Sequence, residues 1–215
     1  MNMFEGTPIS HIDSPDIFLF SVSLILLGLV VWIRQGFLKE WRLADWLINN
    51  MKRIWQRGAD EVPQAEGVFV NHLAGIIALS TITWFDLPFY ICLCIGAGIV
   101  IARKIMFAVL GAIHKTSQLG NEHSIIDRLS RLWMSLGIGI IALILSLVPS
   151  PEDFQPLLLF SVVWGLSILF RWFRVFQSAK RRLHSFSYSF LYLCALEIFP
   201  VLAFMIILDA SKMWI

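Results

Sequence analysis

The sequence predicts an all-α integral membrane protein, a bundle of about six transmembrane helices with an amphipathic helix on its cytoplasmic side. Three observations lead to this fold class. Apolar residues make up 58% of the chain, the mean hydropathy is +0.75, and sixteen of the seventeen Lys and Arg residues fall in alternate gaps between apolar runs. Such a composition is typical of membrane-spanning chains and exceeds what one soluble core requires.

Six apolar runs are long enough, or nearly long enough, to cross a membrane, because about 20 helical residues span a hydrocarbon core of ~30 Å. They cover residues 17–33, 67–85, 87–113, 132–149, 156–176 and 186–208. The sequence shows no internal repeat and no low-complexity linker, so we expect a single transmembrane domain over residues 1–215.

The basic residues predict the orientation of these spans. From the N-terminal tail to the C-terminal tail, the successive segments outside and at the ends of the runs carry 0, 6, 0, 5, 0, 5 and 1 Lys or Arg residues. Because basic residues near span ends stay on the cytoplasmic side, we expect both termini on the outer side. The N-terminal tail contains Glu5, Asp13 and Asp16 and no basic residue, so we do not expect a cleaved signal peptide.

An amphipathic helix is expected at about residues 36–57, between the first two spans. Its apolar stripe has spacings of three and four and consists of Phe37, Trp41, Ala44, Ile48, Met51 and Trp55. Basic residues occupy the other faces, which suits a helix in the inner headgroup layer. Two interpretations stay open: a plain interfacial connector, or a docking surface for a partner protein.

The third gap contains residue types that bind metals, namely His114, Glu122, His123 and Asp127. His123 and Asp127 would share one helical face, but a zinc site needs a third protein ligand, and no supporting motif accompanies them. We therefore interpret this stretch as a solvated helix start. We expect no metal, no cofactor and no catalytic residue, since no motif of a known enzyme class is present.

Glu197 is the one acidic residue near the middle of a predicted span. A carboxylate there costs about 2.5–3.5 kcal/mol on insertion scales, so it should be paired, protonated or functional. Pro200 should kink the same helix and leave a carbonyl unpaired nearby. We expect Glu197 and Pro200 to form a polar notch, with Arg171 as the first candidate partner and Arg103 as the second. A fastening contact, a proton or ion relay, and a contact with a partner subunit are the three interpretations.

Small residues in the third and fourth spans predict close packing between helices. They are Gly96, Gly98, Ser135, Gly137 and Gly139. Small side chains let helix backbones approach each other in lipid, and this pattern is common in membrane bundles.

The segment from Phe190 to Pro200 resembles the closing motif of an uncharacterised family of multi-span inner-membrane proteins of Bacteroidota. Its Leu-Tyr-Leu-Cys-Ala-Leu-Glu-Ile-Phe-Pro stretch matches that family at Leu191, Tyr192, Cys194, Leu196, Glu197 and Pro200. Phe199 stands where a smaller aliphatic residue is more usual. The resemblance implies a bacterial inner membrane and carries no activity with it. In such a membrane, the outer side that the basic-residue count predicts for both termini is the periplasm.

From these features we expect a non-enzymatic accessory or scaffold subunit of a larger inner-membrane complex, such as one for protein export or envelope assembly. The alternative is a small proton- or ion-coupled transporter that uses Glu197. The expected partners are the lipid bilayer and other inner-membrane subunits, with no nucleic acid, and a homo-oligomer stays open.

Overall fold

The computed structural model describes residues 14–57, 64–83, 88–113, 117–147 and 156–181. These residues form helices only, as the sequence predicts. The helices are α1 (Ser14–Gly36), α2 (Leu38–Asn49), α3 (Met51–Arg57), α4 (Ala65–Thr83), α5 (Phe89–Ile113), α6 (Ser117–Leu147) and α7 (Pro156–Arg181).

Five of these helices are long and apolar enough to cross a membrane. The qualifying stretches are Ile17–Gly36, Ala65–Thr83, Phe89–Val109, Asn121–Leu147 and Leu157–Ser178. They correspond to the first five expected spans and are compatible with a multi-pass membrane protein. The sixth expected span, at residues 186–208, lies outside the described residues.

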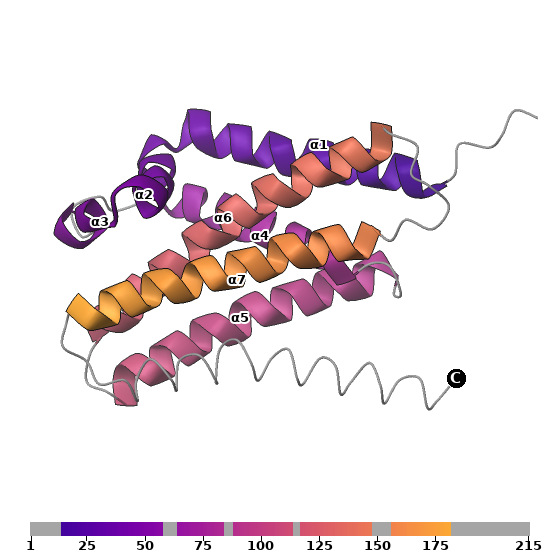
Figure 1. Ribbon diagram of the computed structural model, residues 1–215. Helices are drawn as coiled ribbons and strands as arrows, with labels where there is room; N and C mark the ends of the chain where they lie inside the picture. The colour runs from indigo at the N-terminus through magenta and orange to yellow at the C-terminus, as the bar shows by residue number, and fades with distance from the viewer. Residues whose placement is uncertain (1–13, 58–63, 84–87, 114–116, 148–155, 182–215) are drawn as a thin grey trace, which may run out of the picture.

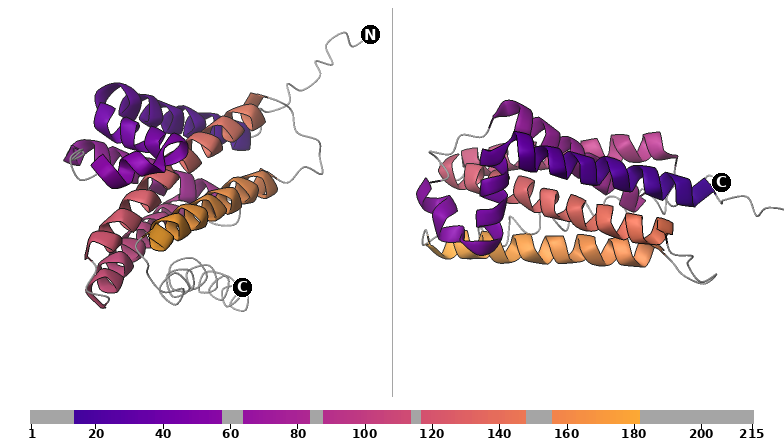
Figure 2. Two further views of the ribbon diagram at one scale, coloured as in Figure 1. Left: turned by 60° about the vertical axis from the view of Figure 1, so that its left-hand side comes forward. Right: turned by 90° about the horizontal axis from the view of Figure 1, so that it is seen from above.

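The long helices run back and forth along one bundle (Figure 1), and α6 packs against α1, α2, α4, α5 and α7. The C-terminal ends of α1, α5 and α7 lie at the same end of the bundle as the N-terminal ends of α4 and α6. The short helices α2 and α3 lie across this end (Figure 2). We call it the basic end, because the basic stretches of the sequence gather there, and the opposite end the apolar end.

Helix α6 extends well before residue 132, the predicted start of the fourth span. Helix α6 begins at Ser117 and continues without a break to Leu147, a length of 31 residues. At 1.5 Å per residue this is about 46 Å, more than the ~30 Å of a hydrocarbon core. The charged residues before Leu132 belong to this helix, and other helices pair with two of them, Asp127 and Arg128.

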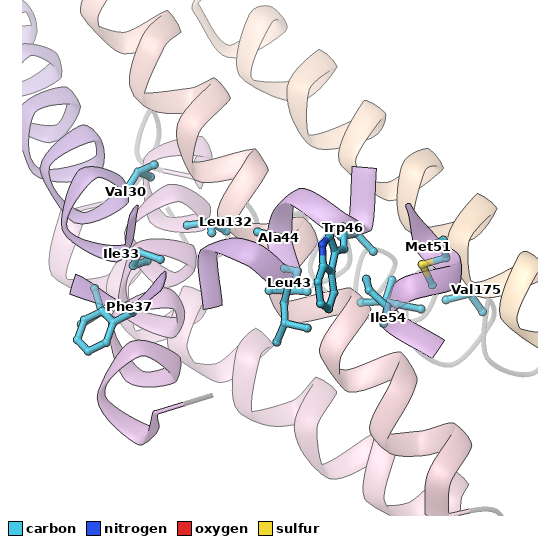
Figure 3. Close-up of a cluster of buried hydrophobic side chains, with 14 of the residues drawn as sticks. Val30, Ile33, Phe37, Leu43, Ala44, Trp46, Met51, Ile54, Leu132 and Val175 are labelled. Atoms are coloured by element: carbon cyan, nitrogen blue, oxygen red, sulfur yellow. The ribbon is translucent and has the colours of Figure 1, made fainter. Parts of the chain in front are cut away.

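The expected amphipathic helix is two helices, and part of its apolar stripe faces protein. The side chain of Trp55, the last residue of the expected stripe, lies outside what the structure describes. Asn50 separates α2 from α3 with an extended backbone, φ −153° and ψ 71°. One apolar cluster buries residues of α2 and α3 together with residues of α1, α6 and α7 (Figure 3). Phe37, Ala44 and Met51 of the expected stripe are buried there, and Trp41 packs against the cluster, but Ile48 is exposed. A helix free to lie in the headgroup layer would not have Leu43, Trp46 and Leu47 buried on a different side.

Candidate functional site

The densest group of buried charges in the described chain is centred on Asp127 of α6. Its Oδ1 accepts hydrogen bonds from Arg103 Nη1 of α5 at 2.8 Å and from Arg171 Nη1 of α7 at 2.7 Å. Its Oδ2 accepts one from Arg131, one turn further along α6. The Asp127 side chain is only 2% exposed and the three arginines are buried as well. One carboxylate therefore joins three helices.

Regular helix geometry explains why these residues meet. Asp127 and Arg131 are four residues apart and so lie on one face of α6. Helices α5 and α7 start at the same end of the bundle (Figure 1). Arg103 lies ~21 Å and Arg171 ~22 Å along their helices from the first residue, at 1.5 Å per residue. Both side chains consequently lie at the same level of the bundle, just past the middle of α5 and α7 toward the basic end.

A second buried carboxylate, Glu40 of α2, lies beside the first network. Arg128 of α6 holds both of its oxygens: Nε lies 2.9 Å from Oε1, and Nη2 donates to Oε2 at 3.1 Å. Asn71 Nδ2 of α4 also donates to Oε1, at 2.8 Å. Arg128 follows Asp127 directly in the chain, so Glu40 is held to α6 by the residue next to Asp127. We call the groups around Asp127 and Glu40 together the charge network.

Two further residues complete the contact between α4 and α6. His72 Nδ1 lies 3.3 Å from Arg131 Nη2. At Gly75, one turn along α4, an added Cβ would lie 3.1 Å from Arg131 Cδ and 3.3 Å from its Nε. The absence of a side chain at Gly75 therefore leaves the space through which Arg131 reaches Asp127.

The buried acidic and basic side chains of the charge network depend on one another. Removing a carboxylate or a guanidinium from water costs several kcal/mol per ion, and only close pairing with good hydrogen bonds offsets that cost. Asp127 obtains three such partners and Glu40 obtains a guanidinium and an amide. Each carboxylate thus satisfies groups that would otherwise be expensive to bury, and each depends on them in return.

Helix α2 is fixed to the bundle by further polar contacts. Trp133 Nε1 of α6 donates to the carbonyl of Ala44 at 3.1 Å. Arg174 Nη2 of α7 donates to the carbonyl of Ile48 at 2.6 Å, near the C-terminal end of α2, where cations are favoured. Together with the pairing of Glu40 and Arg128, these contacts bind α2 to α6 and α7.

The structure describes two of the four residues of the expected polar notch, Arg171 and Arg103. Arg171 and Arg103 bind Asp127, a residue that the sequence analysis assigned to a solvated helix start. That assignment is wrong, because Asp127 and His123 are both buried. Glu197 and Pro200 lie outside the described residues, so their predicted contact with Arg171 stays a prediction.

The small residues lie in contacts between helices, with one exception. A Cβ on Gly96 of α5 would lie 2.8 Å from the carbonyl oxygen of Ile76 of α4. Gly139 packs on Leu26 and Leu27 of α1, and Gly137 packs on Val163 of α7. Gly98 has nothing within 4 Å of an added Cβ. Ser135 is buried and donates to the carbonyl of Arg131 one turn earlier.

The sequence analysis missed Asp127, Glu40, Asn71 and His72. A signal for Asp127 existed: apolar residues around it continue the buried face of α6 toward the N-terminus, namely Ile126, Leu129 and Leu132. An Asp–Arg pair four residues apart on an otherwise apolar helical face indicates a buried ion pair as readily as a solvated one. No similar signal marks Glu40, which lies among exposed charges on α2.

The site offers charge pairing and not metal coordination. Within the described residues, no group of three or more His, Cys, Asp or Glu side chains could hold a metal ion. The guanidinium groups around Asp127 also occupy the space that a cation would need.

A family model described as a domain of unknown function, DUF4271, matches residues 4–208. The chain belongs to the DUF4271 family. The matched region contains both carboxylates and every partner named above, so the charge network lies wholly inside the domain that defines the family. No curated protein and no solved structure shows significant similarity to the chain.

Proposed function

We propose that this DUF4271 protein is a non-enzymatic accessory or scaffold subunit of a larger complex in the inner membrane of Bacteroidota, such as a complex for protein export or envelope assembly. The observation that carries the proposal is that the buried charges join helices to one another. Asp127 joins α5, α6 and α7, and Glu40 joins α2, α4 and α6. Buried groups paired in this way fasten helices together, which is what a rigid scaffold needs.

The location and orientation belong to the same proposal. The alternation of basic residues supports a membrane protein with its basic end in the cytoplasm and both termini in the periplasm. The bundle supports this reading because α2, α3 and the basic ends of the long helices lie together (Figure 2). Many large apolar side chains point outward from the spans, for example Leu158, Leu166 and Leu169 of α7. Lipid and neighbouring subunits are the surroundings that suit such a surface.

Cysteine labelling tests the orientation. On a background without Cys92, Cys94 and Cys194, we expect a membrane-impermeant maleimide added from outside to modify a cysteine at position 152 and to spare one at position 118. The physical reason is the retention of the basic segments in the cytoplasm. The reverse labelling pattern would overturn the topology.

Co-purification tests the scaffold role. The full chain, extracted in mild detergent from its native membrane, should bring inner-membrane proteins with it at a fixed ratio, measured by quantitative mass spectrometry. Asp127→Asn should reduce that ratio because it weakens the fastening of the helices, whereas Asp45→Asn should leave it unchanged, since Asp45 is exposed and contacts only Asn49 among the hydrogen bonds described. A chain that is fully functional in cells and always isolated alone would contradict the proposal.

A proton- or ion-coupled transporter that uses Glu197 is the second candidate. The observation that favours it is a buried network with ionisable groups, including Asp127 and His72, on helices that could span the membrane. Such groups mark proton and ion paths in many carriers.

The substitution Glu197→Gln separates the two candidates. If Glu197 is a fastener, the amide keeps shape and hydrogen bonding, and both assembly and cellular function should persist. If it is a relay, the variant should assemble normally but lose proton flux, measured with a pH-sensitive dye in liposomes under an imposed potential. Proton flux in the unchanged protein that disappears in Glu197→Gln would replace the scaffold proposal with the transporter.

A further inference from the structure

The part of the charge network around Asp127 contains more positive than negative charge. Three guanidinium groups, those of Arg103, Arg131 and Arg171, donate to this one carboxylate. Because arginine keeps its charge in proteins, three positive groups and one negative group give a net charge of +2. The part around Glu40 is balanced by its own arginine. A buried net charge is costly, and a further carboxylate beside the three arginines lowers that cost.

Two of these arginines meet at one atom although they belong to different helices. Nη1 of Arg103 lies 2.8 Å and Nη1 of Arg171 lies 2.7 Å from the same oxygen, Oδ1 of Asp127. Each guanidinium group has five N–H donors in a planar fork that matches a carboxylate. A second carboxylate at this place can therefore contact both arginines.

The level of this place can be counted from the basic end of the bundle. Arg103 is ten residues before Ile113, the last residue of α5, and Arg171 is ten residues before Arg181, the last residue of α7. At 1.5 Å per residue, both arginines lie ~15 Å from that end. A second carboxylate must reach the same level to contact them.

The sequence after α7 contains a carboxylate at the matching distance. Residues 186–208, the sixth expected span, lie outside the described residues, and four residues separate this run from Arg181. A connection of this length joins antiparallel neighbours in helical bundles. Counted as a helix from residue 186, Glu197 comes ~16 Å from the basic end, within ~2 Å of the level of the two arginines. Glu197 is also the only acidic residue of the run.

We propose that the sixth expected span packs against the charge network and that Glu197 contacts the guanidinium groups of both Arg103 and Arg171. Asp127 and Glu197 then share three arginines, and the net charge of the group falls from +2 to +1. The inference deepens the proposed scaffold role, since it rests on Glu197 being a fastener and names the groups that Glu197 fastens.

Cysteine cross-linking tests the position of Glu197. On the cysteine-free background used for labelling, Arg171→Cys with Glu197→Cys removes one charge of each sign and so preserves the net charge of the group. A short bis-methanethiosulfonate reagent, added to the full chain in its membrane, should join the two positions, measured by mass spectrometry of the cross-linked peptides. Arg103→Cys with Glu197→Cys should behave in the same way.

The matched control uses the opposite face of α7. Leu169 lies two residues before Arg171, at nearly the same level, but its side chain is exposed whereas that of Arg171 is buried. Leu169→Cys with Glu197→Cys, combined with Arg171→Gln to keep the charges equal, should lose the cross-link. A cross-link from position 169 in place of position 171, or from none of the three positions, would overturn the proposal.

An exchange of charges tests the pairing itself. Glu197→Arg adds a fourth guanidinium group to the network and should lower the folding equilibrium constant more than about tenfold, a loss of at least 1.4 kcal/mol. Addition of Arg171→Glu restores an opposite charge at the same level and should recover the folded fraction, measured by size-exclusion chromatography in detergent. Lys180→Glu, which reverses an exposed cation of the same helix, is the control and should not recover it.

Equal recovery by Arg171→Glu and Lys180→Glu would also overturn the proposal, because net charge and not a specific contact would then decide folding. Neither experiment depends on which proteins co-purify with the chain. The contact of Glu197 and the scaffold role can therefore fail separately.

Discussion

The basic end and the apolar end of the bundle are built from the same five long helices but are held together by different interactions. At the apolar end many buried side chains are hydrocarbon, such as Leu26, Ile138 and Phe160, and buried polar ones such as Ser80 and Thr81 carry a hydroxyl group and no charge. At the basic end, an apolar cluster surrounds the charge network of Asp127 and Glu40. In the membrane that we propose as the surroundings, the two ends would therefore hold their helices together in different ways.

The difference matters because lipid is itself apolar. Apolar side chains gain little by leaving lipid tails for a protein interior, so the apolar end depends on close contact and on small residues. At the basic end, Asp127 binds Arg103 and Arg171, which lie on other helices and are 24 and 44 residues away in the sequence. Removing either partner of a buried ion pair leaves an uncompensated charge, which is costly in a low dielectric medium. We therefore expect single substitutions to be most harmful at the basic end.

The largest expected effect is that of Asp127→Ala. The substitution leaves three buried guanidinium groups without their shared carboxylate, and breaking buried pairs in this way costs about 3–5 kcal/mol. The free energy of unfolding in mixed micelles measures it. Asp45→Ala, on the exposed face of α2, is the control and should change the free energy by less than ~0.5 kcal/mol. Equal effects of the two substitutions would show that the charge network does not fasten the bundle.

A smaller effect is expected for Glu40→Gln, which keeps the shape of the side chain but removes its charge. Hydrogen bonds to charged groups contribute about 1.5–3 kcal/mol, and Arg128 would lose its ionic partner. We expect α2 to detach before the spans separate, because Glu40 joins α2 to α4 and α6. A cysteine at the buried position 44 should then react faster with a maleimide. Unchanged reactivity would mean that the apolar cluster alone holds α2.

At the apolar end, the expected effects depend on space. Gly96→Ala brings a Cβ within 2.8 Å of a backbone oxygen of α4 and 2.9 Å of Ser80 Oγ, so α4 and α5 must move apart. Overpacking of this kind costs about 1–3 kcal/mol. Gly98→Ala in the same helix meets nothing within 4 Å and should be neutral or slightly stabilising. Equal loss of stability in both variants would indicate that helix flexibility, and not contact, is what glycine supplies.

Much of the apolar end could be predicted from the sequence, because an apolar run long enough to cross a membrane is visible locally. The start of α6 could not be predicted from the sequence in this way. Its first turns contain charges that look solvated until Arg103 and Arg171, on other helices, are known to reach Asp127. The buried side of α2 was hidden for the same reason, since the arginine that neutralises Glu40 lies 88 residues further along the chain.

Glu197 attracted attention because it is a lone acid in an apolar run, whereas Asp127 stands among basic residues and so looks ordinary. A charge that stands alone is easy to recognise in a sequence. A charge whose partners lie on three helices becomes recognisable only when the helices are assembled.

The smallest expected effect concerns two tryptophans near the basic end. Trp133→Phe removes the indole N–H that donates to the carbonyl of Ala44, and a neutral hydrogen bond of this kind contributes about 0.5–1.5 kcal/mol. Trp172→Phe is the matched control. Within the described residues, its buried indole N–H has no acceptor, so removing it leaves no group newly unsatisfied and should be neutral or stabilising. The unfolding free energies of the two variants should therefore change in different directions or by clearly different amounts. If Trp172→Phe destabilises the chain as much as Trp133→Phe does, the loss reflects the smaller ring and not the bond that joins α2 to α6.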